Sequence, residues 1–393
     1  MLALGYSSLA ANSHAQEPVS EEHSTIEPSI GIELRYDDNI YSSATQKESS
    51  LITLLSPGLL AIFVPSKHRF ELEYNGNYST YEQSSADNSE DHELLASAFL
   101  ELGLRSQLDI FGSYEDGHEN RGSGLSDGLN PDFDPVLEQP DEYTQRRLNG
   151  RLTYGVTGTR GRLVFEAGER ALRYKNNRER TEFFNYDNTH ASATFYFRIM
   201  PSTSLLVDVR ANEFDYQVDR ALQPRLDSTE YRYLLGVTWD VTDKTTGTVK
   251  FGYVEKQYAD TARARFSDTS WEVYVRWSPL KYSHFDFMTS RYPSEVTSLT
   301  GDVIENTTYS VAWSHDWTTS VRTRLGTYYV DQDFRGTAST RLQTFSAHSL
   351  TAAYKMRRWL TWEFGINVNA QDSNIDRFGF DGTVVRLGAI FTF

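Results

Sequence analysis

The chain has 393 residues, of which 54 are acidic and 38 basic, so its formal net charge is −16. The acidic excess argues against nucleic acid as a partner, and the absence of cysteine excludes disulfides, thiolate metal sites and cysteine nucleophiles. A mean hydropathy of −0.53 is typical of soluble proteins, and no apolar run beyond the N-terminus is long enough for a transmembrane helix. The aromatic content, with 24 Tyr, 22 Phe and 7 Trp, is high for a soluble acidic protein.

Residues 1–15 look like the end of a secretory signal peptide. The stretch is short and apolar and closes on a small-x-small site at Ser13-His14-Ala15, although the basic start of such a signal is missing. We expect residues 1–15 to be a signal-peptide remnant. The alternative is that they form a disordered N-terminus. Residues 16–28 are polar and acidic and are expected to form a flexible lead-in on the periplasmic side.

From residue 29 to residue 393, apolar and polar residues alternate in segments of roughly ten to fourteen residues. One example is the apolar set Tyr231, Tyr233 and Leu235, which is interleaved with Arg232 and Leu234. Successive side chains of a strand point to opposite faces, so this period predicts strands with one apolar face. No sustained helical period is present, and the sequence predicts an all-β domain.

The connections between these segments alternate between short and long. Eight short turns are predicted near 65–67, 105–106, 158–161, 201–203, 243–244, 278–279, 318–319 and 357–358. Nine longer polar stretches lie near 42–49, 83–92, 116–142, 175–186, 218–228, 259–268, 293–303, 334–343 and 372–380. Together they predict about 18 strands, with 16 as the alternative, and both termini on the short-turn side.

This pattern favours a transmembrane antiparallel up-and-down β-barrel over a soluble sandwich or propeller. Strands of soluble sheets have about five or six residues, whereas outer-membrane strands need about nine to eleven. Alternation of short turns and long loops is also typical of outer-membrane barrels. Backbone groups in lipid must pair within the protein, so the sheet has to close. We therefore expect residues 29–393 to form one barrel in the outer membrane of a Gram-negative bacterium.

Aromatic residues are expected to mark the two membrane interfaces of such a barrel. Those near the predicted short turns are Trp239, Trp277, Trp313, Trp359, Phe391 and Phe393. Those near the predicted long loops are Tyr36, Tyr78, Tyr174, Tyr253 and Tyr329. Half of each strand would face lipid and half a wet lumen, which explains the soluble-looking average hydropathy.

Both ends of the predicted barrel carry a resemblance. The last strand, with Arg386, Gly388, Phe391 and Phe393, resembles the C-terminal signal of bacterial outer-membrane barrels, which implies the outer-membrane assembly machinery as a partner. The first strand closes on Tyr36-Asp37-Asp38-Asn39 and is similar to the opening of β-barrel porins from exopolysaccharide gene clusters. The similarity in strand pattern spans almost the whole mature chain.

That resemblance implies an outer-membrane channel or assembly component for capsule or exopolysaccharide biosynthesis and export. Its partners would be outer-membrane lipid and lipopolysaccharide, the polysaccharide itself and periplasmic export components. The alternatives are a general or solute-selective diffusion porin and a structural outer-membrane protein with a plugged lumen.

A barrel of this size leaves an aqueous channel unless a loop or the N-terminal segment plugs it. The predicted polar faces carry basic candidates for the lumen wall at Arg198, Arg210, Arg232, Lys250, Arg276, Arg322 and Arg324. The acidic candidates are Glu71, Glu73 and Glu101. Charges of one sign on adjacent strands would produce a transverse field that guides an anionic sugar polymer. The alternative is that these residues pair with one another.

The longest loop, 116–142, is strongly acidic and is predicted either to fold inward and narrow the pore, or to stay outside and bind divalent cations shared with lipopolysaccharide phosphates. The stretch from Asp127 to Asp134 lacks the spacing of a defined calcium loop, so a solvated run of charge is the favoured interpretation. Two histidine–carboxylate pairs, around His92 and His284, are the only candidates for catalysis, and no nucleophile elbow or metal-ligand spacing accompanies them. The sequence predicts neither an enzyme nor a cofactor or metal site.

Overall fold

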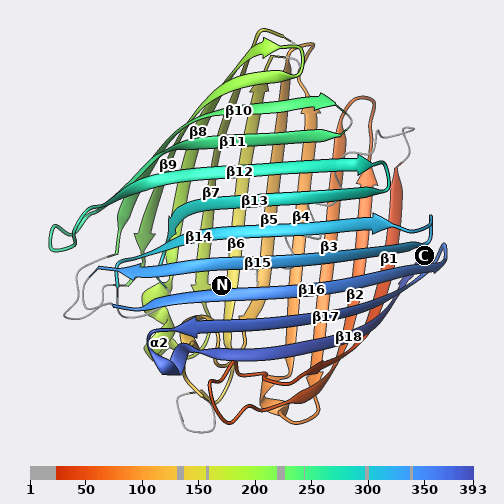
Figure 1. Cartoon of the computed structure of the whole chain (residues 1–393), viewed down its shortest axis with the longest axis vertical. Coiled ribbons are helices and arrows are strands. Elements are labelled where there is room, and N and C mark those ends of the chain that lie inside the picture. Colours follow the sequence, from red (N-terminus) through yellow and green to blue (C-terminus); the bar gives the residue numbers. More distant parts are fainter. Residues whose placement is uncertain are drawn as a thin grey trace.

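A computed structural model describes residues 24–130, 137–155, 159–218, 226–242, 244–296, 301–336 and 340–393. The predicted signal remnant and most of the predicted lead-in lie outside these residues. In the described part, 18 strands form one antiparallel sheet, and each strand pairs with its neighbours in the chain. The last strand also pairs with the first, so the sheet is a closed barrel (Figure 1). The predicted all-β class and the strand number of 18 are confirmed.

The strands are longer than those of soluble sheets, as predicted. Their bounds are β1 Thr25–Asp37, β2 Ser50–Phe63, β3 Arg69–Tyr81, β4 Ser89–Glu101, β5 Ser106–Glu119, β6 Asp141–Tyr154, β7 Gly161–Tyr174, β8 Tyr186–Met200, β9 Thr203–Tyr216, β10 Ser228–Thr242, β11 Thr245–Tyr258, β12 Phe266–Leu280, β13 Ser283–Ser294, β14 Val303–Asp316, β15 Val321–Arg335, β16 Leu342–Arg357, β17 Leu360–Ser373 and β18 Phe380–Thr392. Within the described residues, the connections contain one short helix, α2 (Arg178–Thr181), and four single 3₁₀ turns. No helix in the described part of the chain is long and apolar enough to cross a membrane.

Several boundaries differ from those predicted, among them the start of the first strand and one short turn. The first strand begins at Thr25, so it includes the last four residues of the stretch 16–28 taken as the lead-in. The turn predicted at 278–279 lies instead at 281–282, because Ser278 and Pro279 continue β12. The pairing of β12 with β13 shifts register between Trp277 and Leu280. A proline has no N–H to give to a ladder, and such an irregularity accommodates it.

The two faces of the wall alternate as the period of two requires. In β10, Tyr231, Tyr233 and Leu235 are exposed on the outer face, whereas Arg232 and Leu234 are buried on the inner face. Exposed apolar side chains recur on every part of the outer wall, which suits contact with hydrocarbon rather than water. The outer wall is therefore the surface that lipid covers.

Aromatic side chains mark both ends of this outer wall. Trp277 and Trp359 are exposed near the short turns, and Tyr36, Tyr253 and Tyr329 are exposed near the long loops. Tyr174 is an exception to the predicted girdle. It points inward, is buried, and donates a hydrogen bond to Glu119 (3.0 Å). The long connections lie along the left and lower edges of Figure 1, and the short turns lie along its upper and right edges.

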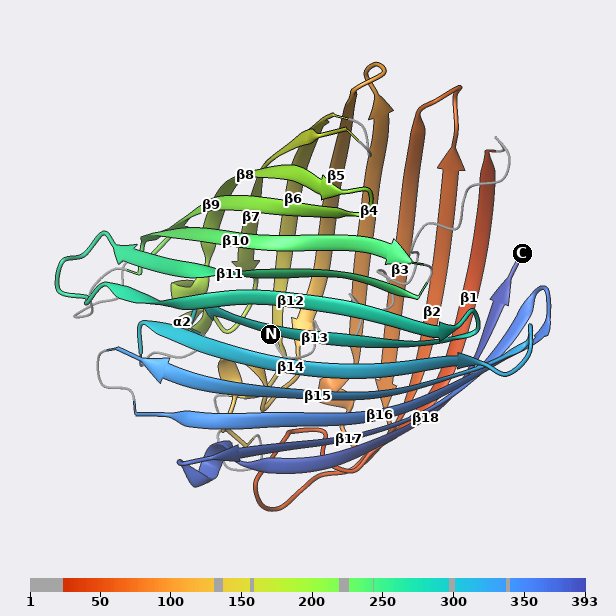
Figure 2. The ribbon, with the colours of Figure 1, turned by 45° about the horizontal axis from the view of Figure 1, so that its top comes forward.

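The seam between β1 and β18 completes the barrel, and Figure 2 shows the two strands side by side. Its register runs from Ser29 opposite Thr392 to Asp37 opposite Val384. The backbone N–H of Phe393 adds a bond to the carbonyl of Pro28 (2.9 Å). Because the number of strands is even, both strands of the seam have their free ends on the short-turn side.

Candidate functional site: the lumen and its outer mouth

The inward side chains are buried at one end of the barrel and exposed to solvent at the other. At the long-loop end, inward side chains such as Ile52, Gln145 and Lys256 are at most 2% exposed. At the short-turn end, the inward side chain of Arg322 is 63% exposed and that of Arg151 is 46% exposed. In the orientation of outer-membrane barrels, long loops face outward. The lumen is thus filled at its extracellular mouth and hydrated toward the periplasm.

Arg121 anchors the long connection between β5 and β6 inside this mouth. Its guanidinium donates to both carboxylate oxygens of Asp87 (2.8 and 2.6 Å), to the Tyr41 hydroxyl (3.0 Å) and to the Ser84 hydroxyl (2.8 Å). A further bond reaches the carbonyl of Leu137 on the returning part of the same connection (3.1 Å). Arg121 and Asp87 are both buried. One side chain thereby joins the β5–β6 connection to the connections β1–β2 and β3–β4.

The same connection reaches the far side of the barrel through Asp127. The Asp127 carboxylate forms an ion pair with Arg341, which lies between β15 and β16, nearly half-way round the sheet. The Arg341 guanidinium lies over the rings of Phe378 (3.5 Å) and Phe334 (4.3 Å), and it donates to Gln343 (2.6 Å). The β5–β6 connection therefore crosses the mouth, which is the inward folding that the sequence left open.

Asp127 is not part of a solvated charge run, so that interpretation is wrong at this position. Burial is the largest influence on the pair: it raises the pKa of the Asp127 carboxyl against the opposing effect of Arg341, and it lowers the pKa of the Arg341 guanidinium. Ionising either group at this place is costly, because the surrounding loops remove most of the solvent around the pair. Residues 131–136, which include Asp132 and Asp134, lie outside the described part of the chain.

An apolar cluster occupies another part of the mouth. It joins strands on opposite walls with two loop residues, and its buried members are Tyr186, Tyr216, Leu226, Val296, Ile304 and Phe334. Leu226 belongs to the β9–β10 connection and Val296 to the β13–β14 connection. We call this set the mouth cluster. Phe334 also touches Arg341, so the mouth cluster and the crossing connection form one continuous packing unit.

All ten predicted lumen residues lie on the inner wall, but the basic ones do not form an unbalanced track. Arg210 pairs with Asp208 (2.6 Å) and Glu272 (2.6 Å). Lys250 pairs with the same two carboxylates (2.8 and 3.3 Å). Arg232 contacts Glu272 (3.1 Å) and Glu230 (3.1 Å). Three cations and three carboxylates thus neutralise one another, as in the pairing alternative.

Two members of this network, Asp208 and Glu230, were missed in the sequence. Each stands two residues before an arginine of the predicted track, at Arg210 and Arg232, and residues two apart share a face of a strand. The period of two that placed the arginines in the lumen therefore also places these carboxylates there.

Five of the other seven predicted lumen residues have local side-chain partners. Arg276 pairs with Asp286 (2.7 Å), Arg322 with Asp316, and Arg324 donates to the Ser314 hydroxyl (3.2 Å). Glu71 pairs with Arg69, Glu73 accepts a bond from Asn75 (2.9 Å), and Glu101 is exposed at the end of β4. Arg198 lies on the inner face close to the β8–β9 turn. None of these contacts makes a field of one sign across the lumen.

The residues of the two terminal motifs lie at the seam. Asp38 accepts a bond from the backbone N–H of Thr383 (2.6 Å), and the side chain of Asn39 donates to the carbonyls of Ser43 and Asp381 (3.0 and 2.8 Å). The Asp37 carboxylate accepts from the N–H of Asn39 (2.9 Å), whereas Tyr36 points outward. This motif thus fastens the β1–β2 connection to the start of β18.

At the other end of the seam, the C-terminal motif lies among β1, β17 and β18. Gly388 stands opposite Glu33 on one side and Glu363 on the other. The ring of Phe391 stacks on Trp359 at 6.1 Å, and Phe393 is exposed on the outer face. Arg386 points inward beside Thr351 (3.5 Å).

The histidine–carboxylate pairs do not assemble a catalytic site. His92 lies on the outer wall against the Tyr74 hydroxyl (2.9 Å), while its neighbour Asp91 points inward and binds His118 (2.7 Å). His284 and Asp286 are 3.9 Å apart, and Asp286 is engaged by Arg276. Among the residues that the structure describes, no three His, Asp or Glu side chains form a group suited to a metal ion.

Comparison with known proteins agrees with this architecture. The structure resembles the FrpB iron transporter (F5-1 variant) of Neisseria meningitidis with a TM-score of 0.51 and 10% identity, covering 95% of this chain and 83% of that one. The outer membrane protein opdK of Pseudomonas aeruginosa gives a TM-score of 0.48 and 11% identity, covering 94% and 99%. At 10% identity the likeness to the FrpB transporter concerns the fold alone. No protein of curated function matches the sequence.

The sequence itself matches the family described as "Putative beta-barrel porin 2" over residues 24–393, which include all 18 strands. A closed barrel with an apolar outer wall is also the form in which a β-sheet crosses a membrane. The chain therefore belongs to this β-barrel porin family and is a porin-like channel protein of the Gram-negative outer membrane.

Proposed function

We propose that this barrel is a channel or assembly component for the export of an exopolysaccharide, and that its extracellular mouth is closed at rest. The association with exopolysaccharide rests on the resemblance of the strand ending in Tyr36-Asp37-Asp38-Asn39 to porins of such gene clusters. The resting closure rests on the crossing connection and the mouth cluster. No catalytic step is part of the proposal.

The observation that carries the proposal is the contrast between the two ends of the lumen. Loop residues fill the extracellular mouth, among them Arg121, Asp127, Leu226 and Val296. The strands behind them form a barrel wide enough for an aqueous channel. Loops can move without breaking the hydrogen-bonded wall, and loop motion is the usual basis of gating. A polymer arriving from the periplasm would therefore enter a wet vestibule and meet a removable barrier.

The balanced charges on the inner wall bear on the cargo. Arg210, Arg232 and Lys250 are already paired with carboxylates, so they offer little net attraction to a polyanion. A polar wall without net charge binds a sugar instead through hydrogen bonds to the hydroxyl groups of the sugar. The proposal accordingly does not require the exported glycan to be anionic.

A conductance experiment on purified protein in planar bilayers tests the closure. Arg121→Met removes the anchor of the crossing connection, and Lys47→Met removes an exposed ion pair to Asp381 (2.6 Å) as a matched control. We expect small, rare openings for the wild type and the control, and frequent large openings for Arg121→Met. A constantly open wild type would instead identify a diffusion porin, and a barrel that stays shut in all three would identify a plugged structural protein.

Secretion tests the cargo. A strain lacking the barrel should release less polysaccharide, and wild-type protein supplied on a plasmid should restore it. Normal secretion in the deletion strain would reject the export role even if the channel measurements succeed. Glycosyltransferase and polymerase genes beside the coding sequence would support export, whereas catabolic genes would support uptake.

A further inference from the structure

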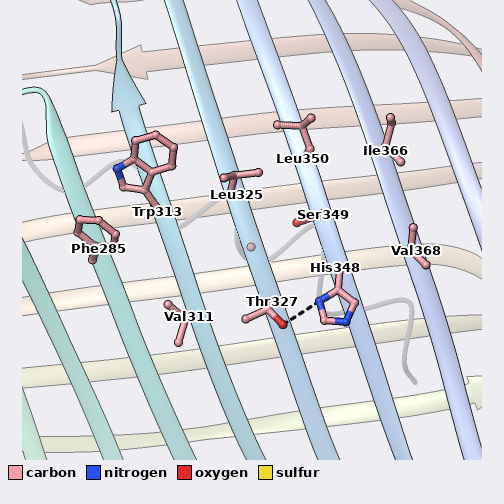
Figure 3. A pocket seen from close by; sticks show the side chains of 11 residues that line it. Phe285, Val311, Trp313, Leu325, Thr327, His348, Ser349, Leu350, Ile366 and Val368 are labelled. Carbon is pink, nitrogen blue, oxygen red and sulfur yellow. Dashed lines mark hydrogen bonds between the residues drawn. The ribbon is translucent and has the colours of Figure 1, made fainter.

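An apolar groove crosses the outer wall over β13 to β17 (Figure 3). It has a volume of about 480 Å³, and its lining includes Phe285, Trp313, Leu325, Leu350, Ile366 and Val368. The small side chain of Thr327 lies in the middle and shares a hydrogen bond with His348 (3.0 Å). Small residues between large ones leave this depression. Since the outer wall faces lipid, whatever fills the groove in the membrane must itself be apolar.

A polar pocket lies on the same five strands, nearer the long loops. Its volume is about 520 Å³, and its lining includes Arg291, Glu305, Asp331, Arg335, Thr344 and Asp372. Arg335 pairs with Asp333 (2.8 Å), with Asp268 (3.3 Å) and with Glu305, and its side chain is 41% exposed. Asp331 accepts a bond from the Thr344 hydroxyl (2.8 Å), and both Asp331 and Asp372 are exposed. The pocket thus presents mainly hydrogen-bond acceptors, because carboxylates already engage its exposed guanidinium.

The spacing of the two cavities matches the thickness of one lipid leaflet. Thr327 in the groove and Asp333 in the pocket are both on β15, where six residues extend about 20 Å at about 3.3 Å per residue. A strand tilt of about 40° reduces this to about 15 Å along the membrane normal. Half of a hydrocarbon core of about 30 Å is also about 15 Å. One amphipathic molecule can therefore occupy both cavities at once.

We propose that the groove and the pocket together form a binding site for one glycolipid of the outer leaflet, lipopolysaccharide, with an acyl chain in the groove and head-group sugars in the pocket. Carboxylates such as Asp331 and Asp372 accept hydrogen bonds from sugar hydroxyls. Arg335 is already engaged by Asp333, Asp268 and Glu305, so the sugars rather than a phosphate are the part of the head group that the pocket holds. The pocket lies at the long-loop end, which is the end that meets the outer leaflet.

A second copy of the barrel fits this surface less well. A symmetric dimer in the membrane would bring the same patch of both copies together. The pocket and its immediate partners contain the carboxylates Asp268, Glu305, Asp331, Asp333 and Asp372 against the arginines Arg291 and Arg335. Like charges would then face one another across the contact. The hydroxyl groups of head-group sugars are uncharged and donate hydrogen bonds to carboxylates, so the sugars themselves have no such conflict.

Native mass spectrometry of the full chain in detergent tests the proposal with defined lipids. The probes are bisphosphorylated lipid A, its monophosphorylated form, and phosphatidylethanolamine with acyl chains of the same length. We expect one lipid A molecule per barrel, retained in at least tenfold preference to phosphatidylethanolamine. We expect comparable retention of the two lipid A forms, because the sugars are the part held in the pocket, and a large loss with the monophosphorylated form would contradict this assignment of the sugars to the pocket.

Two variants separate the groove from the pocket. Thr327→Trp fills the groove and should reduce lipid A retention at least tenfold. Ala193→Trp adds the same ring on the lipid-facing side of β8, between Phe165 and Val209, and should leave retention unchanged. The double variant Asp331→Asn and Asp372→Asn should weaken lipid A retention severalfold without changing that of phosphatidylethanolamine.

Equal retention of lipid A by wild type and Thr327→Trp would overturn the site, and so would equal retention of lipid A and phosphatidylethanolamine by the wild type. Heat-modifiable mobility on gels checks that each variant is a folded barrel. The site does not depend on the export role, because it lies on the outer wall and away from the mouth.

Discussion

Arg121→Met is expected to open the extracellular mouth. In the closed state the Arg121 guanidinium makes bonds to Asp87, Tyr41, Ser84 and the carbonyl of Leu137. Methionine retains part of the apolar stem of the side chain but none of these bonds. It also leaves the Asp87 carboxylate, whose side chain is 6% exposed, without its cation.

The magnitude follows from that burial. Removing one partner of a buried ion pair costs about 3–5 kcal/mol. Asp87 still has the Tyr41 hydroxyl at 3.3 Å, so we take the lower value of about 3 kcal/mol. A difference of about 1.4 kcal/mol is a factor of ten, so the ratio of closed to open mouths should fall roughly 100-fold. The ratio of closed to open mouths for Arg121→Lys should lie between those of the wild type and Arg121→Met, because an ammonium keeps the charge but cannot form the paired bonds to Asp87.

Single-channel recording gives this ratio directly from the open probability. Lys47→Met is the control, since an exposed pair contributes about 0–1 kcal/mol. An open probability for Arg121→Met within a factor of three of the wild-type value would refute the reasoning that Arg121 holds the crossing connection in place. A reduced stability of the Arg121→Met barrel without a change in its open probability would also refute this reasoning.

Three further outcomes are expected. Acid pH should close the mouth. Burial outweighs Arg341 and raises the pKa of the Asp127 carboxyl above 3.8 in the closed state, whereas this pKa returns toward its ordinary value when the mouth opens and the carboxyl is exposed. The closed state therefore gains stability as the pH falls through the window above 3.8, and Asp127→Asn should remove this pH dependence of the open probability. Arg210→Ala should leave the inner-wall network with one excess negative charge. The reversal potential of the opened channel in a salt gradient should therefore shift toward cation preference. An unchanged reversal potential would count against a role of this network in the lumen. Gly252→Ala should impair barrel formation, as seen on heat-modifiable gels, because the added Cβ would lie 1.8 Å from the backbone carbonyl oxygen of Tyr233. Gly150→Ala is the control and should fold normally, because the nearest heavy atom to its added Cβ would be 3.9 Å away.

The strands were predictable because their signal is local. Each residue of β10, for example, reports its own face through the alternation of Tyr231, Arg232 and Tyr233. Turns interrupt that period and so set the strand number. The exceptions are residues whose type does not decide the face: Tyr174 suits either a membrane interface or a buried mouth, and only the packing of the loops places it inside.

The mouth was not predictable in the same way. The pairs Arg121–Asp87 and Asp127–Arg341 join residues from connections that share no period and lie far apart in the chain. The sequence showed an acidic loop and two possible directions for it, and the choice depends on which cations the closed barrel brings opposite. The outer groove was missed for a related reason: the alternation places Thr327 and Leu325 on the lipid face, but a depression arises only from the sizes of neighbours on five strands.

The seam between β1 and β18 has a consequence for how the barrel forms. Its partners, from Ser29 with Thr392 to Asp37 with Val384, are separated by nearly the whole chain. Bringing such distant segments together costs about 4 kcal/mol more chain entropy than closing a five-residue hairpin. Local hairpins should therefore form early, while their unpaired edge strands remain prone to aggregation until the last strand arrives. We expect pulse-labelled protein to show protease-resistant hairpins before the heat-stable barrel, with strand closure as the slow step.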